Sequence, residues 1–299
     1  MTKSAVKTKR FAYACTFAAI VAASSAAFAA QRPAQISYQA VLRDVLAATD
    51  SVYCTQLMEI LPSIHHFNTD PFNWYVLKEG GRLTLVDAGF PGHYPVFLEG
   101  LRYIGSDLKD VEAIILTHAH ADHMGFAERV RRATNAPVFV HEADLAAAGR
   151  PLQLPWWGLL SNAWRPFTAS MLGRAIGNGV FSLSRLNQVR TFRDGDVLDV
   201  PGRPRVLHAP GHTPGEVAFH LPERDVLIGG DVLVTRNLMS GEFGPPQVPH
   251  RSLNANDTQA RRSLDRLREL GRVTLLPGHG KPWTGQMTDA IEHARALPA

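Results

Sequence analysis

A cluster of metal-ligand side chains lies between His118 and His123. The sequence there reads His118-Ala119-His120-Ala121-Asp122-His123 and directly follows the apolar run Val111 to Leu116. Such a run predicts a buried strand, so the cluster is expected where a strand ends and a loop begins. Imidazole nitrogen and carboxylate oxygen suit zinc, and open coordination positions make a zinc site catalytic. We therefore expect a metal site at a strand end, where His118 and His120 can converge on one ion and Asp122 and His123 can hold a second.

Three later motifs place the same ligand types after predicted strands. His212 stands in Pro-Gly-His-Thr-Pro-Gly, Asp231 follows two glycines, and His279 is flanked by glycines. Glycine permits tight turns and close backbone approach, which lets a ligand side chain project from a strand end. These recurrences disfavour the alternative that the first cluster is a polar surface patch that binds nothing.

The wider pattern alternates strands with helices, which predicts a layered α/β arrangement. The expected strands cover residues 74–77, 83–86, 111–116, 137–140, 189–192, 197–200, 205–208, 217–220, 226–228 and 273–276. The expected helices cover residues 95–104, 124–133, 256–270 and 287–297.

The N-terminus resembles a secretory signal. Residues 1–29 combine a basic start, an apolar stretch and the small-residue site Ala27-Phe28-Ala29. We expect cleavage and a periplasmic or secreted protein; an uncleaved membrane anchor is the alternative. Residues 30–70 are interpreted as an N-terminal segment, with a helix within residues 41–61, and residues 71–299 as the main domain.

The charge balance argues against a nucleic-acid partner. Four of the 31 basic residues lie within residues 1–29, which contain no acidic residue, so the remaining chain has 27 basic and 27 acidic side chains. A neutral mature chain lacks the basic surface that nucleic acid requires. Cys54 is then the one remaining cysteine, so we expect no intramolecular disulfide and no thiolate ligand.

Residues 145–187 differ from the rest because three tryptophans, Trp156, Trp157 and Trp164, fall within nine residues. Pro166 suits the first turn of a helix that ends near Gly177. A buried helical pair is one interpretation, and a lid or wall that gives an active site an apolar pocket is another. Peripheral membrane contact is a third, but we expect none once the signal is removed.

The motifs in this order resemble those of the metallo-β-lactamase superfamily. HxHxDH is preceded by Val86-Asp87-Ala88-Gly89 and followed by the PGHTPG, GGD and GHG motifs, over residues 72–283. The resemblance implies an αββα sandwich, in which two mixed sheets face each other with helices on both outer sides. It implies one metal ion on His118, His120 and His212, a second on Asp122, His123 and His279, and Asp231 bridging both. Asp87 would orient a ligand imidazole or stabilise a turn.

Charge supports a hydrolytic centre. Two divalent ions carry four positive charges, and the carboxylates of Asp122 and Asp231 neutralise two of them. The two positive charges that remain favour bound hydroxide over bound water. That hydroxide is the expected nucleophile, and Asp122 the candidate to orient it or move a proton. Zinc is the first choice of metal, although iron and manganese can occupy the same ligands.

The substrate is a small molecule whose class is only partly constrained. Within the family that the chain resembles, Asp231 at the bridging position, in place of cysteine or serine, implies the glyoxalase II, lactonase and arylsulfatase or phosphodiesterase-like branches rather than true β-lactamases. About 20 residues follow His279, too few for the helical domain of glyoxalase II, and no tyrosine follows Tyr103 to assist a lactone, which leaves Arg236 or Asn237 for that role. We expect hydrolysis of an ester, thioester or lactone with an apolar part. The alternatives are a β-lactamase-like amide hydrolase and a non-catalytic metal-binding scaffold or sensor.

Overall fold

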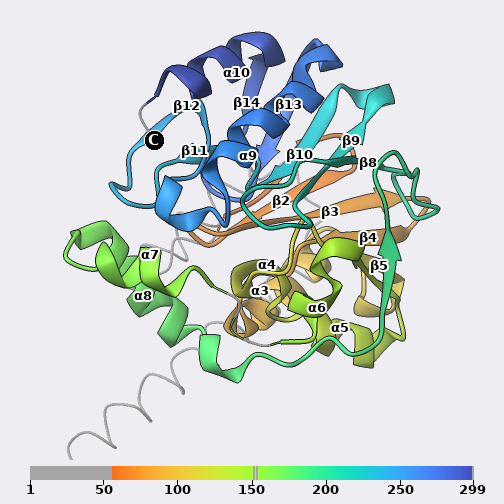
Figure 1. The fold of residues 1–299 in the computed structure, drawn as a ribbon. Helices are drawn as coiled ribbons and strands as arrows, with labels where there is room; N and C mark the ends of the chain where they lie inside the picture. The colour runs from red at the N-terminus through yellow and green to blue at the C-terminus, as the bar shows by residue number, and fades with distance from the viewer. Residues whose placement is uncertain (1–55, 151, 153, 298–299) are drawn as a thin grey trace, which may run out of the picture. The chain divides into compact units, whose positions relative to one another are not determined.

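The computed structural model describes residues 56–297 except 151 and 153 (Figure 1). The predicted signal peptide, Cys54 and most of the predicted N-terminal segment lie outside these residues. Among the described helices, none combines the length and the apolar character that crossing a bilayer requires.

Two mixed sheets face each other. The first has the order β1-β2-β3-β4-β5-β6-β7, and the second the order β14-β13-β10-β9-β8. The first contains Gln56–Leu61, Ile64–Asn68, Asn73–Glu79, Arg82–Val86, Val111–Ile115, Val138–His141 and Val189–Phe192 in chain order. The second contains Arg205–His208 (β8), Val217–Leu221 (β9), Val226–Gly230 (β10), Arg272–Pro277 (β13) and Trp283–Gln286 (β14). A hairpin joins Val234–Arg236 (β11) to Phe243–Gln247 (β12).

Helices cover the outer faces of both sheets (Figure 1). The α-helices are Tyr94–Tyr103 (α3), Ala121–Met124 (α4), Ala127–Thr134 (α5), Leu145–Ala148 (α6), Trp156–Ser161 (α7), Pro166–Gly177 (α8), Asp257–Ser263 (α9) and Met287–Ala296 (α10). Short 3₁₀ helices cover Pro91–His93, Leu108–Asp110, Glu142–Asp144, Val180–Ser182, Pro222–Arg224, Arg251–Leu253 and Leu264–Leu270. The expected αββα sandwich is confirmed.

Strand alternation explains how the layers pack. On β3, Tyr75 and Leu77 point into the core between the sheets, where Phe219 and Ile228 meet them from the second sheet. Trp74 points to the opposite face and packs edge-on against Phe126, beside α5. Side chains two residues apart share a face of a strand, so one strand supplies both the inter-sheet core and the helix-covered face.

The structure differs from the predicted elements in several places. The sheet begins at Gln56, ahead of the predicted domain start at residue 71, and residues 56–61 form a strand rather than part of a helix. The histidines of β2 concealed its apolar pattern, and β2, β11, β12 and β14 were not predicted. Residues 197–200 form no strand; Val197 makes one isolated bridge to Arg205.

The predicted helix at residues 124–133 is interrupted. The backbone amides of Gly125 and Phe126 donate hydrogen bonds to the carbonyl oxygens of Gly89 (2.7 Å) and Ala88 (3.0 Å) rather than within a continuous helix. Ala88 N in turn donates to His123 O at 2.6 Å. These three hydrogen bonds connect the loop after β4 to the end of α4, and they hold Asp87 beside His123.

Candidate metal centre

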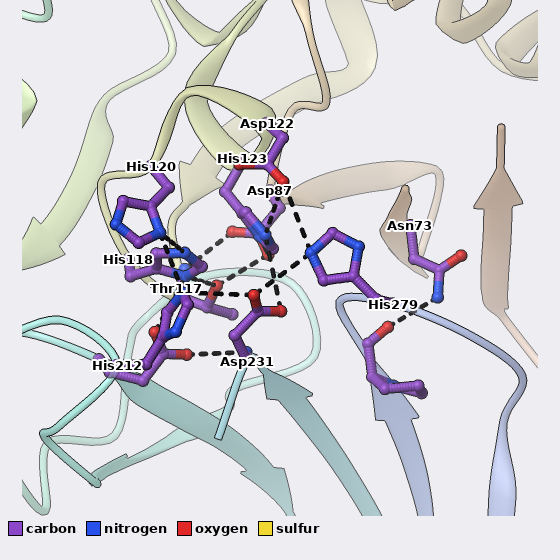
Figure 2. A network of polar contacts seen from close by, with 12 residues as sticks. Asn73, Asp87, Thr117, His118, His120, Asp122, His123, His212, Asp231 and His279 are labelled. Atoms are coloured by element: carbon purple, nitrogen blue, oxygen red, sulfur yellow. Dashed lines mark hydrogen bonds and ion pairs between the residues drawn. The ribbon is translucent and has the colours of Figure 1, made fainter. Parts of the chain in front are cut away.

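All predicted ligands follow strands that end at one edge of the sandwich. The stretch of His118 to His123 follows β5, His212 follows β8, Asp231 follows β10 and His279 follows β13. Since β10 pairs in parallel with β13 and antiparallel with β9, which itself pairs antiparallel with β8, the strands β8, β10 and β13 all end together. The structure brings all seven predicted side chains into one cluster (Figure 2).

The first group consists of three imidazoles. His118 Nε2 lies 3.0 Å and His212 Nε2 lies 2.9 Å from His120 Nδ1. The other nitrogen of His212 donates to Asn254 Oδ1 at 3.1 Å, which leaves an Nε2 lone pair directed at the cluster. A single proton on His120 Nδ1 cannot be donated to both His118 Nε2 and His212 Nε2. The three nitrogen atoms therefore fit a site for one shared cation.

The second group contains Asp122, His123 and His279, whose ligand atoms lie within 4.8 Å of one another. Asp122 Oδ2 is 3.5 Å from His279 Nε2 and 3.9 Å from His123 Nε2. Buried His123 Nε2 has no hydrogen-bond partner within the described residues, as expected for an atom reserved for a metal.

Asp231 lies between the two groups (Figure 2). Its Oδ2 is 3.3 Å from His212 Nε2 and 3.2 Å from His279 Nε2, while Oδ1 is 3.7 Å from His123 Nε2. Asp231 Oδ1 also lacks a hydrogen-bond partner among the described residues. A carboxylate in this position suits two neighbouring cations.

Asp87 orients a predicted ligand. Its Oδ2 accepts hydrogen bonds from His123 Nδ1 and Thr117 Oγ1, both at 2.9 Å, and its Oδ1 accepts from Thr117 N at 2.8 Å. Because Nδ1 of His123 is the donor, Nε2 carries the lone pair that faces the cluster. Of the two interpretations from sequence, the structure favours orientation of an imidazole.

Glu216 is a second buried carboxylate that sequence reasoning missed. Its Oε2 lies 3.0 Å from His118 Nδ1, and its Oε1 accepts from Asp231 N at 2.9 Å. It directly follows the PGHTPG motif, which is the signal that could have identified it. The charge count from sequence included only Asp122 and Asp231, so the centre contains more carboxylates than expected.

Further polar residues hold the ligand loops together. The buried carboxylate of Asp144 accepts from Ala119 N (3.1 Å), Thr213 Oγ1 (2.8 Å) and Gly215 N (2.7 Å), which joins the loops of His118 and His212. On the other side, Asn73 Nδ2 donates to the carbonyl oxygens of Pro277 and Gly280, both at 2.8 Å, around His279. The ligand positions are therefore fixed by hydrogen bonds before any ion binds.

Gly278 is required by close packing. A Cβ atom there would lie 2.3 Å from Asp231 Oδ1 and 2.8 Å from His123 Cε1. Any larger residue would push the carboxylate out of the cluster, which explains the glycine before His279.

The directions in which the pKa values of the clustered histidines are shifted fit a cation site. Burial, together with neighbouring imidazoles, holds the pKa of His118 and His120 well below the usual value, so both are neutral ligands. Burial also lowers the pKa of His123, but Asp87, Asp122 and Asp231 outweigh it and raise that pKa to about 10.

The buried carboxylate of Glu216 also calls for positive charge. Burial, and then the charge of Asp231, raise its pKa well above the usual value. Together with the raised pKa of His123, this shows carboxylates in excess over positive charge, a deficit that divalent cations would correct.

An apolar pocket of about 240 Å³ opens beside the centre. His120, Asp122, His212, Asp231 and His279 form its polar part. Its remaining described lining is apolar: Phe72, Phe90, Leu154, Pro155, Trp156, Leu159, Leu160, Met171, Leu172, Ala175, Ile176, Val180, Phe181, Leu238 and Leu253. Many of these come from α7, α8 and the 3₁₀ helix at Val180–Ser182, so residues 145–187 form a wall of the pocket.

The suggested substrate donors do not line this pocket. The Arg236 guanidinium lies 4.5 Å from the ring centroid of Phe167 and 4.4 Å from that of Phe243, and it pairs with Asp70. Asn237 Oδ1 instead accepts from the backbone amides of residues 239 and 240. Neither residue is placed to assist a substrate at the centre.

The chain belongs to the metallo-beta-lactamase superfamily: residues 68–279 match the family model. "Probable metallo-hydrolase YflN" of Bacillus subtilis is 26% identical over 252 residues, which cover 80% of this chain and 92% of that protein. The uncharacterized protein Rv2581c of Mycobacterium tuberculosis is 31% identical over 225 residues, covering 71% and 87%.

Solved structures share the fold. The metallo-beta-lactamase family protein TTHA1429 of Thermus thermophilus aligns with a TM-score of 0.57 at 27% identity, covering 79% of each chain. BJP-1, a subclass B3 metallo-beta-lactamase of Bradyrhizobium japonicum, aligns with a TM-score of 0.56 at 18% identity, covering 80% of this chain and 90% of that chain. The second likeness concerns the fold alone.

Proposed function

We propose that this protein is an exported, metal-dependent hydrolase that uses two metal ions on an ester, thioester or lactone of a partly apolar small molecule. The observation that carries the proposal is that two groups of ligand side chains form the polar end of an otherwise apolar pocket. The description of YflN as a probable metallo-hydrolase supports the reaction class. Export is supported by the sequence of residues 1–29.

The ligand residues divide between two ions. His118, His120 and His212 would hold one divalent ion; Asp122, His123 and His279 would hold the other, and Asp231 would contact both. Bound divalent ions supply activation of water at neutral pH and polarisation of a substrate oxygen. Zinc suits the nitrogen and oxygen donors, and iron or manganese can use the same set.

Asp122 is the proposed proton carrier. Its side chain lines the pocket and is 12% exposed, more than the 3% of Asp231. Its carboxylate can therefore accept a proton from the attacking water and return it to the leaving group.

The apolar wall selects the substrate. Leu159, Met171 and Ala175 are buried beside the centre, and no lysine or arginine is among the described lining residues. An acyl chain or another apolar group can occupy this space with favourable burial.

β-Lactams fit this pocket less well. A penicillin or cephalosporin nucleus carries a carboxylate, and the described lining offers no basic side chain to bind it. An unpaired carboxylate in an apolar wall is costly. The amide hydrolase is accordingly the second candidate.

A purely structural metal site is also disfavoured. Structural zinc is usually enclosed by four protein ligands, whereas His120, Asp122, His212, Asp231 and His279 all line an open pocket. Small molecules can therefore approach the ions.

The test measures metal content and turnover of chromogenic esters, thioesters, lactones, β-lactams and phosphodiesters. We expect chelator-sensitive turnover of esters, thioesters or lactones that increases with acyl length. Turnover of β-lactams alone would favour the second candidate, and tight metal binding without turnover would favour the scaffold. Mass spectrometry of the exported protein should find a mature chain that begins at residue 30.

A matched pair of variants on α8 tests the apolar wall. Ala175→Leu fills the pocket, while Ala169→Leu makes the same change on the exposed side of the helix. Added bulk in a substrate pocket costs about 10-fold or more in specificity, so Ala175→Leu should lower kcat/KM for long-chain esters relative to short ones. Equal effects of the two substitutions would contradict the pocket assignment.

A further inference from the structure

An exposed apolar surface lies on the segment that forms one wall of the pocket. We call Trp157, Leu160, Trp164, Ile176 and Phe181 the apolar rim. Trp157 and Trp164 are 87% and 76% exposed, and the other three are more than half exposed. Trp157 and Leu160 lie on α7 and Ile176 lies on α8, and both helices are at the periphery of the domain (Figure 1). Isolated exposed apolar residues are ordinary, but five large ones within one short segment, three of them lining a pocket, mark an interaction surface.

The rim is continuous with the pocket. Leu160, Ile176 and Phe181 belong both to the rim and to the pocket lining. Trp156 stacks on Phe181 with ring centroids 6.3 Å apart and nearly parallel planes, which supports the mouth from inside. An apolar molecule can thus pass from the rim into the pocket without crossing a polar barrier.

The charge of this segment identifies its partner. Residues 145–187 contain four arginines and no acidic residue. The Arg165 guanidinium lies 5.0 Å from the ring centroid of Trp164. Arg174 is 3.8 Å from Asp70, whereas Arg150 and Arg185 are exposed, without an ion pair in the described part of the chain. The rest of residues 30–299 has 23 basic and 27 acidic residues, so positive charge is concentrated in this segment.

We propose that the apolar rim docks on an anionic lipid bilayer surface. Tryptophan is enriched at the boundary between headgroups and acyl chains, and arginine is attracted to anionic headgroups. A second copy of the chain fits the rim less well, because two such faces would bring together two copies of a segment that contains four arginines and no acidic residue. The proposal departs from our expectation from sequence of no membrane contact.

Docking also suggests a source for the substrate. A molecule with an acyl chain partitions into the bilayer, and the rim would place the pocket mouth at that surface. This step alone rests on the proposed hydrolytic function; docking itself does not.

The test is sedimentation of the mature protein, purified after export, with vesicles and in the absence of any substrate. One set of vesicles is pure phosphatidylcholine, and the other contains about 30% phosphatidylglycerol. We expect the wild type to bind the anionic vesicles at least about 10-fold more tightly than the neutral ones, with an affinity that falls as salt rises. Equal binding to both sets would overturn the proposal.

Variants locate the contact. Trp157→Ala combined with Trp164→Ala should weaken binding about 10-fold or more, and Arg150→Gln combined with Arg185→Gln should remove the preference for anionic vesicles. Tyr103→Ala removes an exposed aromatic ring from α3 and is the control. None of the mature proteins contains the basic and apolar residues 1–29, so this stretch cannot contribute to vesicle binding.

Two results would overturn the proposal. One is unchanged vesicle binding by the double tryptophan variant. The other is a wild-type dimer, detected by analytical ultracentrifugation, that this variant dissociates while no form binds vesicles. Because no measurement uses turnover, an inactive enzyme that binds anionic vesicles would contradict the proposed function and leave docking supported.

Discussion

The metal centre and the apolar rim both contribute residues to one pocket and are built in contrasting ways. At the centre, buried side chains are held by paired hydrogen bonds; Thr117 N and Oγ1 both donate to Asp87, for example. At the rim, large side chains such as Trp157 face solvent. The contrast shows that the ligand positions depend on a hydrogen-bond network at the strand ends. Under the proposed function, α7 and α8 would determine which substrate enters the pocket.

Removal of the bridging carboxylate should have the largest effect. Asp231→Asn removes the negative charge that lies between both groups, so we expect loss of one ion. The fall in kcat/KM should exceed the roughly 100-fold loss that follows removal of an outer partner of a metal ligand. Elemental analysis and kcat/KM measure the two effects. Full metal content together with full activity would remove Asp231 from the centre.

Removal of an orienting carboxylate should have a smaller effect. Asp87→Asn weakens the hold on His123 Nδ1 and should reduce metal affinity by about 10- to 100-fold. Asp199→Asn, at a fully exposed side chain, is the matched control. Competition with a chromogenic chelator gives the affinities, and similar values for both variants would refute the orienting role.

Glu216→Gln sharpens the comparison between the two ion positions. Glu216 contacts the imidazole of His118 but only the backbone amide of Asp231, so its substitution should weaken binding of the ion held by the three-histidine group, by about 10-fold. A titration that resolves two binding steps should show a change in one step only. Weakening of both steps alike would show that Glu216 acts through the overall charge.

Proton release is the smallest expected effect. Without metal, the raised pKa of His123 keeps this imidazole protonated at pH 7. Its contribution to stability is therefore present below about pH 6.5 and is lost as pH rises through its folded-state pKa of about 10. Metal must displace this proton, so binding should release protons and weaken as pH falls. Calorimetry in buffers of different ionisation enthalpy measures the release; none at pH 7 would contradict the charge argument.

Local sequence patterns predicted most of the ligand cluster and much of the fold. Apolar runs such as Val111–Ile115 form strands that end just before the predicted ligands, as expected. Sequence patterns could predict these strands and the glycine-rich turns after them because both depend on residues that are close together in the chain. The sheet at residues 56–68 was missed because the two histidines in Ile64–Asn68 are buried there, His66 against the Tyr75 ring. Only the tertiary environment makes a histidine a suitable core residue.

Residues that support the centre from a distance were less accessible to prediction. Asp144 joins the loops of His118 and His212, yet nothing in its local sequence distinguishes it from a surface carboxylate. The same holds for Asn73, whose partners at Pro277 and Gly280 are some 200 positions away. Such contacts arise from the packing of distant segments, which short motifs do not record.

Anomalous scattering from crystals grown with zinc tests the central claim most directly. We predict two peaks, each within about 2.0–2.2 Å of its ligand nitrogen and oxygen atoms. One should contact His118, His120 and His212, the other Asp122, His123 and His279, and Asp231 should reach both. A single peak, or peaks away from these side chains, would contradict a two-ion centre at the strand ends.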